Sequence, residues 1–252
     1  MMNKLRFLLH GTIYLGFTIV CCFLYLPTLV LKPKPLRALM VRIYFKAHDV
    51  IEPWFGLTYR KEGWENLPDE PCLIALQHQT GWETMRLPFW FRDFAIIMKI
   101  ELFRIPIWGW YSTRCDMIPI DRSLGKDAVP DMLKTAAEKV AEGRDIIIFP
   151  QGTRTAPGVR KELKTGIAKL YERLQVPVVP VVLNSGVFTS KLGLVKRPGE
   201  ITARMLPAIE PGLSKDQLMK HLQAIMDEEG DRLLEPDIVD RPDRKSDTKQ
   251  AA

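Results

Sequence analysis

The chain has few cysteines, and their spacing excludes two common classes of stabilised site. Cys21, Cys22, Cys72 and Cys115 are the only four among 252 residues, and no two of them show the C-x-x-C spacing of a zinc site. Four cysteines so placed also do not form the dense pattern of a disulfide framework. We therefore expect reduced, structural cysteines that face a cytoplasm, and no metal site built from them.

The sequence also lacks the basic patterns that are typical of nucleic-acid binding. It contains 36 Lys and Arg against 30 Asp and Glu, which gives a formal net charge of +6. A modestly basic protein fits an anionic membrane surface or a phosphorylated substrate, and it would also fit nucleic acid. However, no Lys/Arg run is interleaved with aromatic residues, and no zinc-finger spacing occurs. The charge therefore favours a membrane surface as a partner over nucleic acid.

Charged residues are absent from one long segment near the N-terminus. Residues 7–31 contain no Asp, Glu, Lys or Arg over 25 positions. As a helix at ~1.5 Å per residue this segment is about 37 Å long, and a hydrocarbon core is about 30 Å thick. No small-x-small cleavage site precedes the basic residues Lys32, Lys34 and Arg37, so a membrane anchor is favoured over a signal peptide.

The depth and orientation of this anchor follow from its polar residues and its flanks. Pro27 and His10 weaken the case for a spanning helix and also permit a helix embedded in one leaflet, so both alternatives stay open. The heavier basic cluster follows the segment, and the positive-inside rule therefore places the rest of the chain in the cytoplasm. The next stretch, residues 36–55, predicts an amphipathic helix that lies on the membrane or packs on the domain's own core.

Strand-like and helix-like segments alternate from about residue 60 onward. This alternation predicts an α/β fold with a mixed, largely parallel sheet flanked by helices, preceded by an N-terminal helical membrane-anchoring segment. The predicted strands are 72–77, 94–98, 117–120, 145–149, 178–183 and 201–205. The predicted helices are 82–91, 128–142, 161–173 and 214–230.

The first polar island that follows a predicted strand contains a possible general base. His78 comes directly after an apolar run, and Glu83 follows five residues later. A neutral imidazole can take a proton from a hydroxyl group, and a carboxylate can hold its tautomer. Five residues of ideal helix rotate by about 140° beyond one full turn, so the two side chains meet only if His78 precedes the helix and the chain bends at Gly81. The alternative is a histidine that caps the turn beside a solvated glutamate.

The second island predicts a site for an anion. Gly152, Thr153 and Arg154 follow the strand that ends near residue 149. Glycine lets backbone N–H groups approach an anion, and arginine binds phosphate through two parallel hydrogen bonds. Arg122 and Lys99 also follow predicted strands, so three cations are expected at one edge of the sheet. The alternative for the glycine-rich segment alone is a turn with a surface arginine.

The order of these blocks resembles the glycerolipid acyltransferase family, and within it the bacterial 1-acyl-sn-glycerol-3-phosphate acyltransferases. The likeness covers about residues 60–210. Connecting segments at 63–68, 99–110 and 163–166 also look like that family. The four blocks are His78-x₄-Glu83, Ile120-Asp121-Arg122, residues 149–154 and residues 176–181.

The resemblance implies an enzyme of phospholipid biosynthesis. An acyl group would pass from an acyl-carrier-protein or coenzyme A thioester to the sn-2 hydroxyl of lysophosphatidic acid, giving phosphatidic acid. His78 would deprotonate that hydroxyl, Glu83 would orient His78, and no metal or bound cofactor would take part. The expected location is the bacterial inner membrane, with the catalytic domain on the cytoplasmic side.

The resemblance also implies roles for the second island and a domain organisation. Arg154, Arg122 and Lys99 would bind the substrate phosphate, while Gln151, Gly152 and Thr153 would shape the glycerol site. The expected units are residues 1–58 as membrane-associating helices, 59–227 as the acyltransferase domain and 228–252 as a charged, disordered tail.

Two residues depart from the family's pattern. The family usually has aspartate where this chain has Glu83, and glutamate where it has Gln151. The second change motivates a different acceptor with the same chemistry, such as a lyso-ornithine lipid or another lysophospholipid. A third alternative, of a different class, is a membrane protein that binds anionic lipid without turnover.

Overall fold

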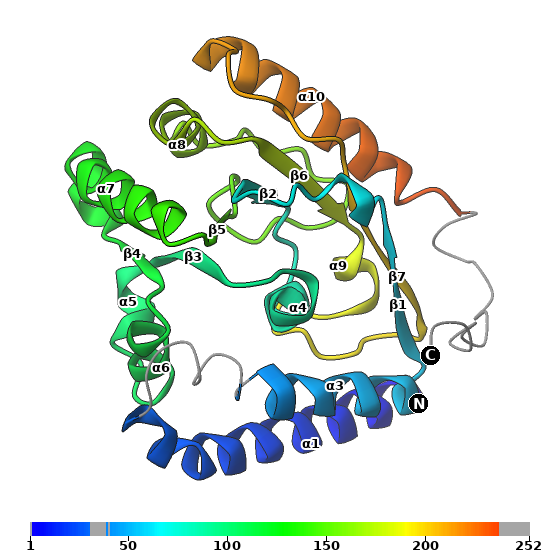
Figure 1. Ribbon diagram of the computed structural model, residues 1–252. Coiled ribbons are helices and arrows are strands. Elements are labelled where there is room, and N and C mark those ends of the chain that lie inside the picture. Colours follow the sequence, from blue (N-terminus) through cyan, green and yellow to red (C-terminus); the bar gives the residue numbers. More distant parts are fainter. Residues whose placement is uncertain (1, 31–38, 40, 237–252) are drawn as a thin grey trace.

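The computed structural model describes residues 2–30, 39 and 41–236, and its centre is a seven-stranded sheet (Figure 1). The strand order is β1-β7-β6-β2-β5-β3-β4. Every neighbouring pair is parallel except β6 and β7, which are antiparallel. The predicted mixed, largely parallel sheet is thus confirmed. The strands are β1 (Leu57–Glu62), β2 (Leu73–Leu76), β3 (Phe94–Lys99), β4 (Ile118–Ile120), β5 (Asp145–Ile148), β6 (Val178–Leu183) and β7 (Gly199–Met205).

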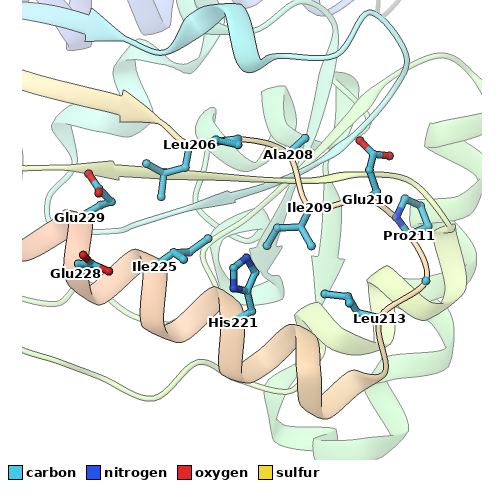
Figure 2. Close-up of a pocket in the computed structure, with 12 residues that line it drawn as sticks. Leu206, Ala208, Ile209, Glu210, Pro211, Leu213, His221, Ile225, Glu228 and Glu229 are labelled. Carbon is cyan, nitrogen blue, oxygen red and sulfur yellow. The ribbon is translucent and has the colours of Figure 1, made fainter.

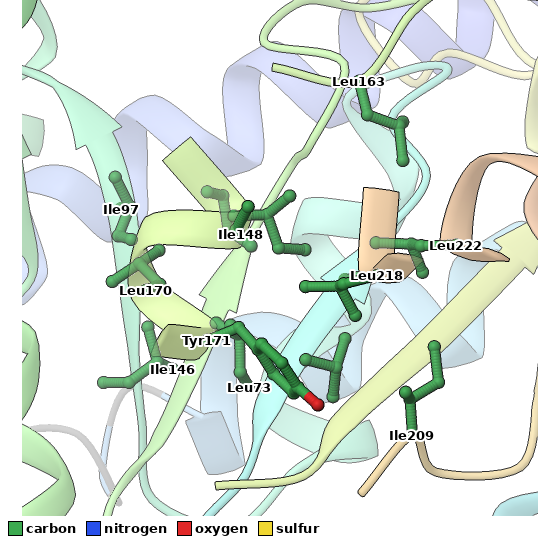
Figure 3. Packing of buried hydrophobic residues seen from close by; sticks show 14 of the residues in the cluster. Leu73, Ile97, Ile146, Ile148, Leu163, Leu170, Tyr171, Ile209, Leu218 and Leu222 are labelled. Atoms are coloured by element: carbon green, nitrogen blue, oxygen red, sulfur yellow. The ribbon is translucent and has the colours of Figure 1, made fainter. Parts of the chain in front are cut away.

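The central strands are apolar because both faces of the sheet are covered. Every residue of β2, β5 and β6 is buried. Successive side chains in a strand point to opposite faces, so Leu73 and Ala75 join one core and Ile74 and Leu76 join the other. Figure 3 shows the first core, in which Leu73 and Ile146 of the sheet pack with helix side chains such as Tyr171.

Four longer helices cover these two faces. On one side lie α7 (Val129–Ala141), α8 (Gly166–Leu174) and α10 (Lys215–Arg232), and on the other lies α4 (Trp82–Trp90) (Figure 1). The helix expected at residues 161–173 begins later, at Gly166. Leu163 is buried, and its backbone N–H donates to the side-chain oxygen of Gln223. The backbone N–H of Lys164 donates to the carbonyl of Pro150. These contacts with other parts of the chain hold the segment in a non-helical conformation.

The sequence did not predict four short elements. They are β1, α5 (Ile100–Phe103), α6 (Trp108–Arg114) and α9 (Ser185–Phe188). The predicted domain boundary at residues 58 and 59 falls inside β1, which is only partly buried beside β7 and lacks an apolar run.

The segment expected to begin a disordered tail at residue 228 is still helical. Helix α10 starts with a Ser214–Gln217 capping box and continues to Arg232. Leu233 is buried, and its carbonyl accepts a hydrogen bond from Asn184. The described chain therefore stays packed on the domain through this point, and residues 237–252 of the predicted tail lie outside the described residues.

The N-terminal segment lies along the surface of the α/β domain (Figure 1). It comprises α1 (Met2–Leu24), η1 (Leu26–Val30), η2 (Val41–Phe45), α3 (Lys46–Ile51) and η3 (Glu52–Phe55). Thr18 of α1 and Tyr44 of η2 are joined by a hydrogen bond of 2.9 Å between their hydroxyl groups. The basic residues Lys32, Lys34 and Arg37 lie outside the described residues.

The stretch predicted as an amphipathic helix at residues 36–55 combines features of both alternatives. Glu52 is buried against α4, where Trp82 donates to it, and His48 is buried against aromatic rings of α1 and η2. Ile43, Val50 and Trp54 are exposed. On α1 the outward apolar side chains are also exposed. They include Leu5, Leu8, Leu9, Leu15, Val20, Phe23 and Leu24.

Candidate active site

The predicted base and its carboxylate meet at the carboxyl end of β2. Nδ1 of His78 lies 2.9 Å from Oε1 of Glu83. His78 precedes α4, whose N-cap is Gly81, so the chain bends where the spacing required it to bend. A Cβ atom on Gly81 would lie 2.8 Å from the carbonyl oxygen of Leu192, so the close approach of this neighbouring loop favours glycine. The fold thus brings the side chains of the H-x₄-E motif into contact.

Glu83 is fully buried and is held by several donors. Oε1 accepts hydrogen bonds from the backbone N–H groups of Gln79 and Thr80, each at 2.6 Å. Oε2 accepts from the hydroxyl groups of Thr80 at 2.9 Å and Ser185 at 2.8 Å. Burial alone would raise the pKa of Glu83, but the bond and charge of His78 and the Thr80 amide outweigh it, and the pKa lies below its usual value. Glu83 is therefore ionised at neutral pH, and an ionised carboxylate only accepts hydrogen bonds.

The imidazole of His78 is also held by the second island. Its ring stacks on Phe149, with centroids 4.0 Å apart and planes inclined by 25°. The backbone N–H of His78 donates to Oε1 of Gln151, and its backbone carbonyl accepts from the backbone N–H of Thr155. With 14% of its side chain exposed, His78 reaches solvent space through a cavity.

The predicted cations surround that cavity, which has a volume of about 1650 Å³. Lys99, Arg122 and Arg154 all line it, together with His78. Lys99 and Arg122 come together because Lys99 pairs with Ile120 across the parallel strands β3 and β4. The guanidinium group of Arg122 also donates to the carbonyl of Gly152.

The remaining predicted residues fall into two groups. Gly152 and Thr153 line the cavity, and Gly152 has a φ of +73°, the left-handed region that glycine adopts most easily. Gln151 is buried, and its side-chain oxygen binds the His78 backbone, so the structure places it behind the base and not among the cavity-lining residues.

Sequence reasoning missed three residues of this site. Lys164 and Lys191 also line the cavity, and like Lys99 and Arg154 they have no carboxylate partner in the part of the chain that the structure describes. Lys164 lies in one of the connecting segments that resemble the family, but nothing in the sequence indicated that its side chain would line the cavity. Ser185 follows β6 and reaches Glu83 only because β6 neighbours β2 in the sheet.

The cavity continues from His78 into an apolar region formed by distant parts of the chain. Side chains of β3 and α6 line it, among them Ile96, Met98 and Trp108. Helix α1 closes one side with residues that include Cys22 and Phe23. The cavity thus combines several cations near His78 with a largely apolar lining, an arrangement suited to a ligand with an anionic head and a hydrocarbon chain.

A second pocket, of about 520 Å³, lies elsewhere on the domain (Figure 2). It is formed by α10 and the loop after β7, and His221 points toward Ile209 there. None of the residues of the two islands lines this pocket. Among the described residues no group of three or more His, Cys, Asp or Glu side chains is arranged to hold a metal ion.

Comparison with known proteins gives matches to one family. The model of the acyltransferase family matches residues 58–184. A 1-acyl-sn-glycerol-3-phosphate acyltransferase of Pseudomonas aeruginosa is 35% identical over 154 residues, which are 61% of this chain and 60% of that protein. A chloroplast 1-acyl-sn-glycerol-3-phosphate acyltransferase of Brassica napus is 33% identical over 124 residues, 48% of this chain and 36% of the relative. The chain thus spans less than two thirds of these curated relatives.

A solved structure shows the same fold. The crystal structure of the 1-acyl-sn-glycerophosphate acyltransferase PlsC from Thermotoga maritima superimposes with a TM-score of 0.67. The two sequences are 22% identical, and the match covers 92% of this chain and 95% of the other.

Proposed function

Because the chain belongs to the acyltransferase family, whose model matches just over half of its 252 residues, we propose that it transfers acyl groups to lysophosphatidic acid. The acyl donor is a thioester of acyl-carrier protein or coenzyme A, the acceptor is the sn-2 hydroxyl, and the product is phosphatidic acid. The observation that carries this proposal is the His78–Glu83 pair, in which His78 lines a largely apolar cavity together with Lys99, Arg122 and Arg154.

The tautomer of His78 suits a general base. Nδ1 donates to the ionised Glu83, so the lone pair lies on Nε2, for which the described residues provide no hydrogen bond. Nε2 takes the proton of the acceptor hydroxyl as its oxygen attacks the thioester carbonyl. The C–S bond then breaks, and the imidazolium returns the proton to the leaving sulfur. Transfer is direct, which agrees with the absence of a G-x-S-x-G sequence for an acyl-enzyme.

The cavity accounts for the rest of the substrate. Arg122, Lys99 and Arg154 bind the phosphate, and Gly152 and Thr153 contact the glycerol. The hydrocarbon chains lie against the apolar part of the cavity lining. The reaction requires no metal and no bound cofactor. A different lyso-lipid acceptor was suggested by Gln151, but the buried position of this side chain weakens that motive.

Helix α1 carries the membrane part of the proposal. Residues Phe7–Leu24 are long and apolar enough to cross a membrane. Yet contacts with the domain recur along α1 and η1, from the Val195 N–H on His10 to the Arg114 guanidinium on the Leu29 carbonyl. A helix held along its length on a globular surface lies in the membrane plane, so α1 occupies one leaflet with its exposed apolar face in the lipid.

The protein then sits on the cytoplasmic face of the bacterial inner membrane. A protease-cleavable tag fused before α1 should be cut in inside-out vesicles and protected in right-side-out ones. Cleavage from the periplasmic side would show that the helix spans the membrane.

Acyl transfer in membranes that carry the protein tests the reaction. Lysophosphatidic acid is supplied with each thioester donor, and His78→Ala is compared with wild type and with His221→Ala, a histidine of the second pocket. We expect phosphatidic acid from wild type and His221→Ala, and a loss of more than ~10² in His78→Ala. Near-wild-type turnover in His78→Ala would show that His78 is not the general base. If none of the three forms product, the protein either uses another acceptor lipid or binds lipid without catalysis.

A further inference from the structure

We infer that Ser185, with Thr80, is a positioning residue that fits this active site to a glutamate at position 83. The inference rests on the proposed function, because it assigns Glu83 the role of holding His78 during acyl transfer. Neither hydroxyl group touches the cavity, so both act through the carboxylate.

The two oxygens of Glu83 have separate sets of partners. Oε1 faces Nδ1 of His78 and two backbone N–H groups. Oε2 points away from the base, and its two donors are the hydroxyl groups of Thr80 and Ser185. The Ser185 and Thr80 hydroxyl oxygens are 3.2 Å apart, so they hold Oε2 from adjacent positions. The carboxylate plane, and with it the direction of Oε1, is therefore set from the side opposite to His78.

Ser185 is itself fixed to the motif and to the sheet. The Gln79 side chain donates to the Leu183 carbonyl at 2.7 Å and accepts from the Gly186 N–H at 2.9 Å, so it spans the segment that contains Ser185. Asn184 accepts from the Thr202 N–H of β7 at 2.9 Å. All of this segment up to Ser185 is buried. The Ser185 hydroxyl is thus a rigid reference point for the carboxylate.

The length of the side chain matters in such a cage. An aspartate has one methylene fewer, and a carboxylate drawn back by one C–C bond, about 1.5 Å, cannot reach Ser185 and His78 together from the same backbone. The hydroxyl pair therefore accounts for a glutamate, and not the shorter aspartate, at position 83. We expect Glu83→Asp to lower kcat by about tenfold or more, because at least one charge-assisted hydrogen bond is lost.

The first test is a double-mutant cycle on acyl transfer. Ser185→Ala, Glu83→Ala and the double variant are compared with wild type, using lysophosphatidic acid and the better thioester donor. We expect Ser185→Ala to lower kcat about 10- to 100-fold, with the KM of each substrate within about twofold. In the Glu83→Ala background the same change should alter kcat by less than about twofold, because Ser185 then has no carboxylate to position.

Three further variants separate positioning from a general loss of stability. Thr80→Val removes a hydroxyl at nearly constant shape and should lower kcat, whereas Thr80→Ser keeps the hydroxyl and should restore most of it. Ser214→Ala removes the N-cap of α10, far from the motif, and should lower the melting temperature while leaving kcat within about twofold. Equal losses from Ser185→Ala in the wild-type and Glu83→Ala backgrounds would show a merely structural role and overturn the inference.

The second test does not depend on the substrate. In protein labelled with ¹⁵N-histidine, the proton on Nδ1 of His78 should give a low-field NMR signal, assigned by its absence in His78→Ala. Ser185→Ala should shift or broaden this signal, and Thr80→Ser should leave it in place. A shifted signal without acyl transfer in wild type would retain the positioning role and reject the proposed reaction. If wild type transfers acyl groups but Ser185→Ala leaves both the signal and kcat unchanged, the positioning role is rejected and the proposed reaction is retained.

Discussion

Replacing Glu83 by glutamine should separate the charge of this residue from its hydrogen bonds. The amide oxygen can still accept from Nδ1 of His78 and from the N–H groups that now bind Oε1. The amide NH₂ can donate to the Ser185 hydroxyl, because a hydroxyl rotates to become an acceptor, whereas the Thr80 hydroxyl already accepts from the Trp82 N–H and the Thr189 hydroxyl. The side chain and the imidazole tautomer should therefore stay in place while the negative charge disappears.

The size of the effect follows from the geometry. With Oε1 at 2.9 Å from Nδ1, the centres of the carboxylate and imidazolium charges are about 4 Å apart. At an effective dielectric constant of about 20, this attraction is worth about 4 kcal/mol. The imidazolium forms only as the hydroxyl attacks, so the loss falls on kcat. Since each 1.36 kcal/mol is a factor of ten, Glu83→Gln should lower kcat by about 10² to 10³.

Initial rates of phosphatidic acid formation in mixed micelles measure this loss, with the melting temperature as a check on folding. The KM values of acceptor and donor should change little, because the buried Glu83 does not line the cavity. A Glu83→Gln enzyme within about threefold of wild type would show that the charge is not needed and would refute the assigned role. A loss confined to KM would do the same.

Three other changes test separate parts of the structure. Arg86→Ala leaves the buried Glu52 without its ion-pair partner and should cost about 3–5 kcal/mol in the free energy of unfolding. Burial already raises the pKa of Glu52 and Arg86 opposes that rise, so removing Arg86 should raise the pKa of Glu52 in the folded protein further. The cost should therefore be largest at neutral pH, shrink as the pH falls through the raised pKa of Glu52, and be nearly gone at about pH 4.3, where Glu52 is protonated in both folded proteins. A cost that is independent of pH, in thermal unfolding at pH 4 and 7.5, would contradict this. Arg122→Gln should raise the KM for lysophosphatidic acid about tenfold or more, with the donor KM within about twofold, and equal changes in both would argue against a phosphate contact. A chain that ends at residue 236 should keep its activity, whereas one that ends at 227 removes Leu233 and should lose it, and equal melting temperatures for the two would show that the end of α10 is dispensable.

The sequence predicted those parts of the fold that depend on local patterns. Strands β2 and β6 and residues 146–148 of β5 are continuous apolar runs because both of their faces are buried, so composition alone marks them. The H-x₄-E contact was also predictable, because the helical period and Gly81 together allow only one arrangement in which His78 and Glu83 meet. Lys99 ends β3 and Arg122 follows β4, and the carboxyl ends of parallel strands share one edge of the sheet.

The parts that depend on strand order could not be predicted in this way. Ser185 lies 102 residues from Glu83, and their contact requires β6 to lie beside β2. Leu233 lies in a charged segment, and its burial and the carbonyl contact with Asn184, which appear only in the fold, show that this segment belongs to the domain. The family resemblance implied that Gln151 would shape the glycerol site, but neighbours in a turn point in different directions, and its side chain turns back to the His78 backbone.

The two faces of α1 place unequal demands on its sequence. The outward face, with Leu8 and Leu15, needs only to be apolar, so many substitutions among large apolar residues should pass unnoticed there. On the inward face His10 is buried against the domain, and Cys21 is buried and also lines the cavity, so substitutions at the cavity-lining positions should change which hydrocarbon chains the cavity accepts. A water-soluble variant should therefore be sought by making the outward face polar. Deleting the helix would remove one wall of the cavity along with the anchor.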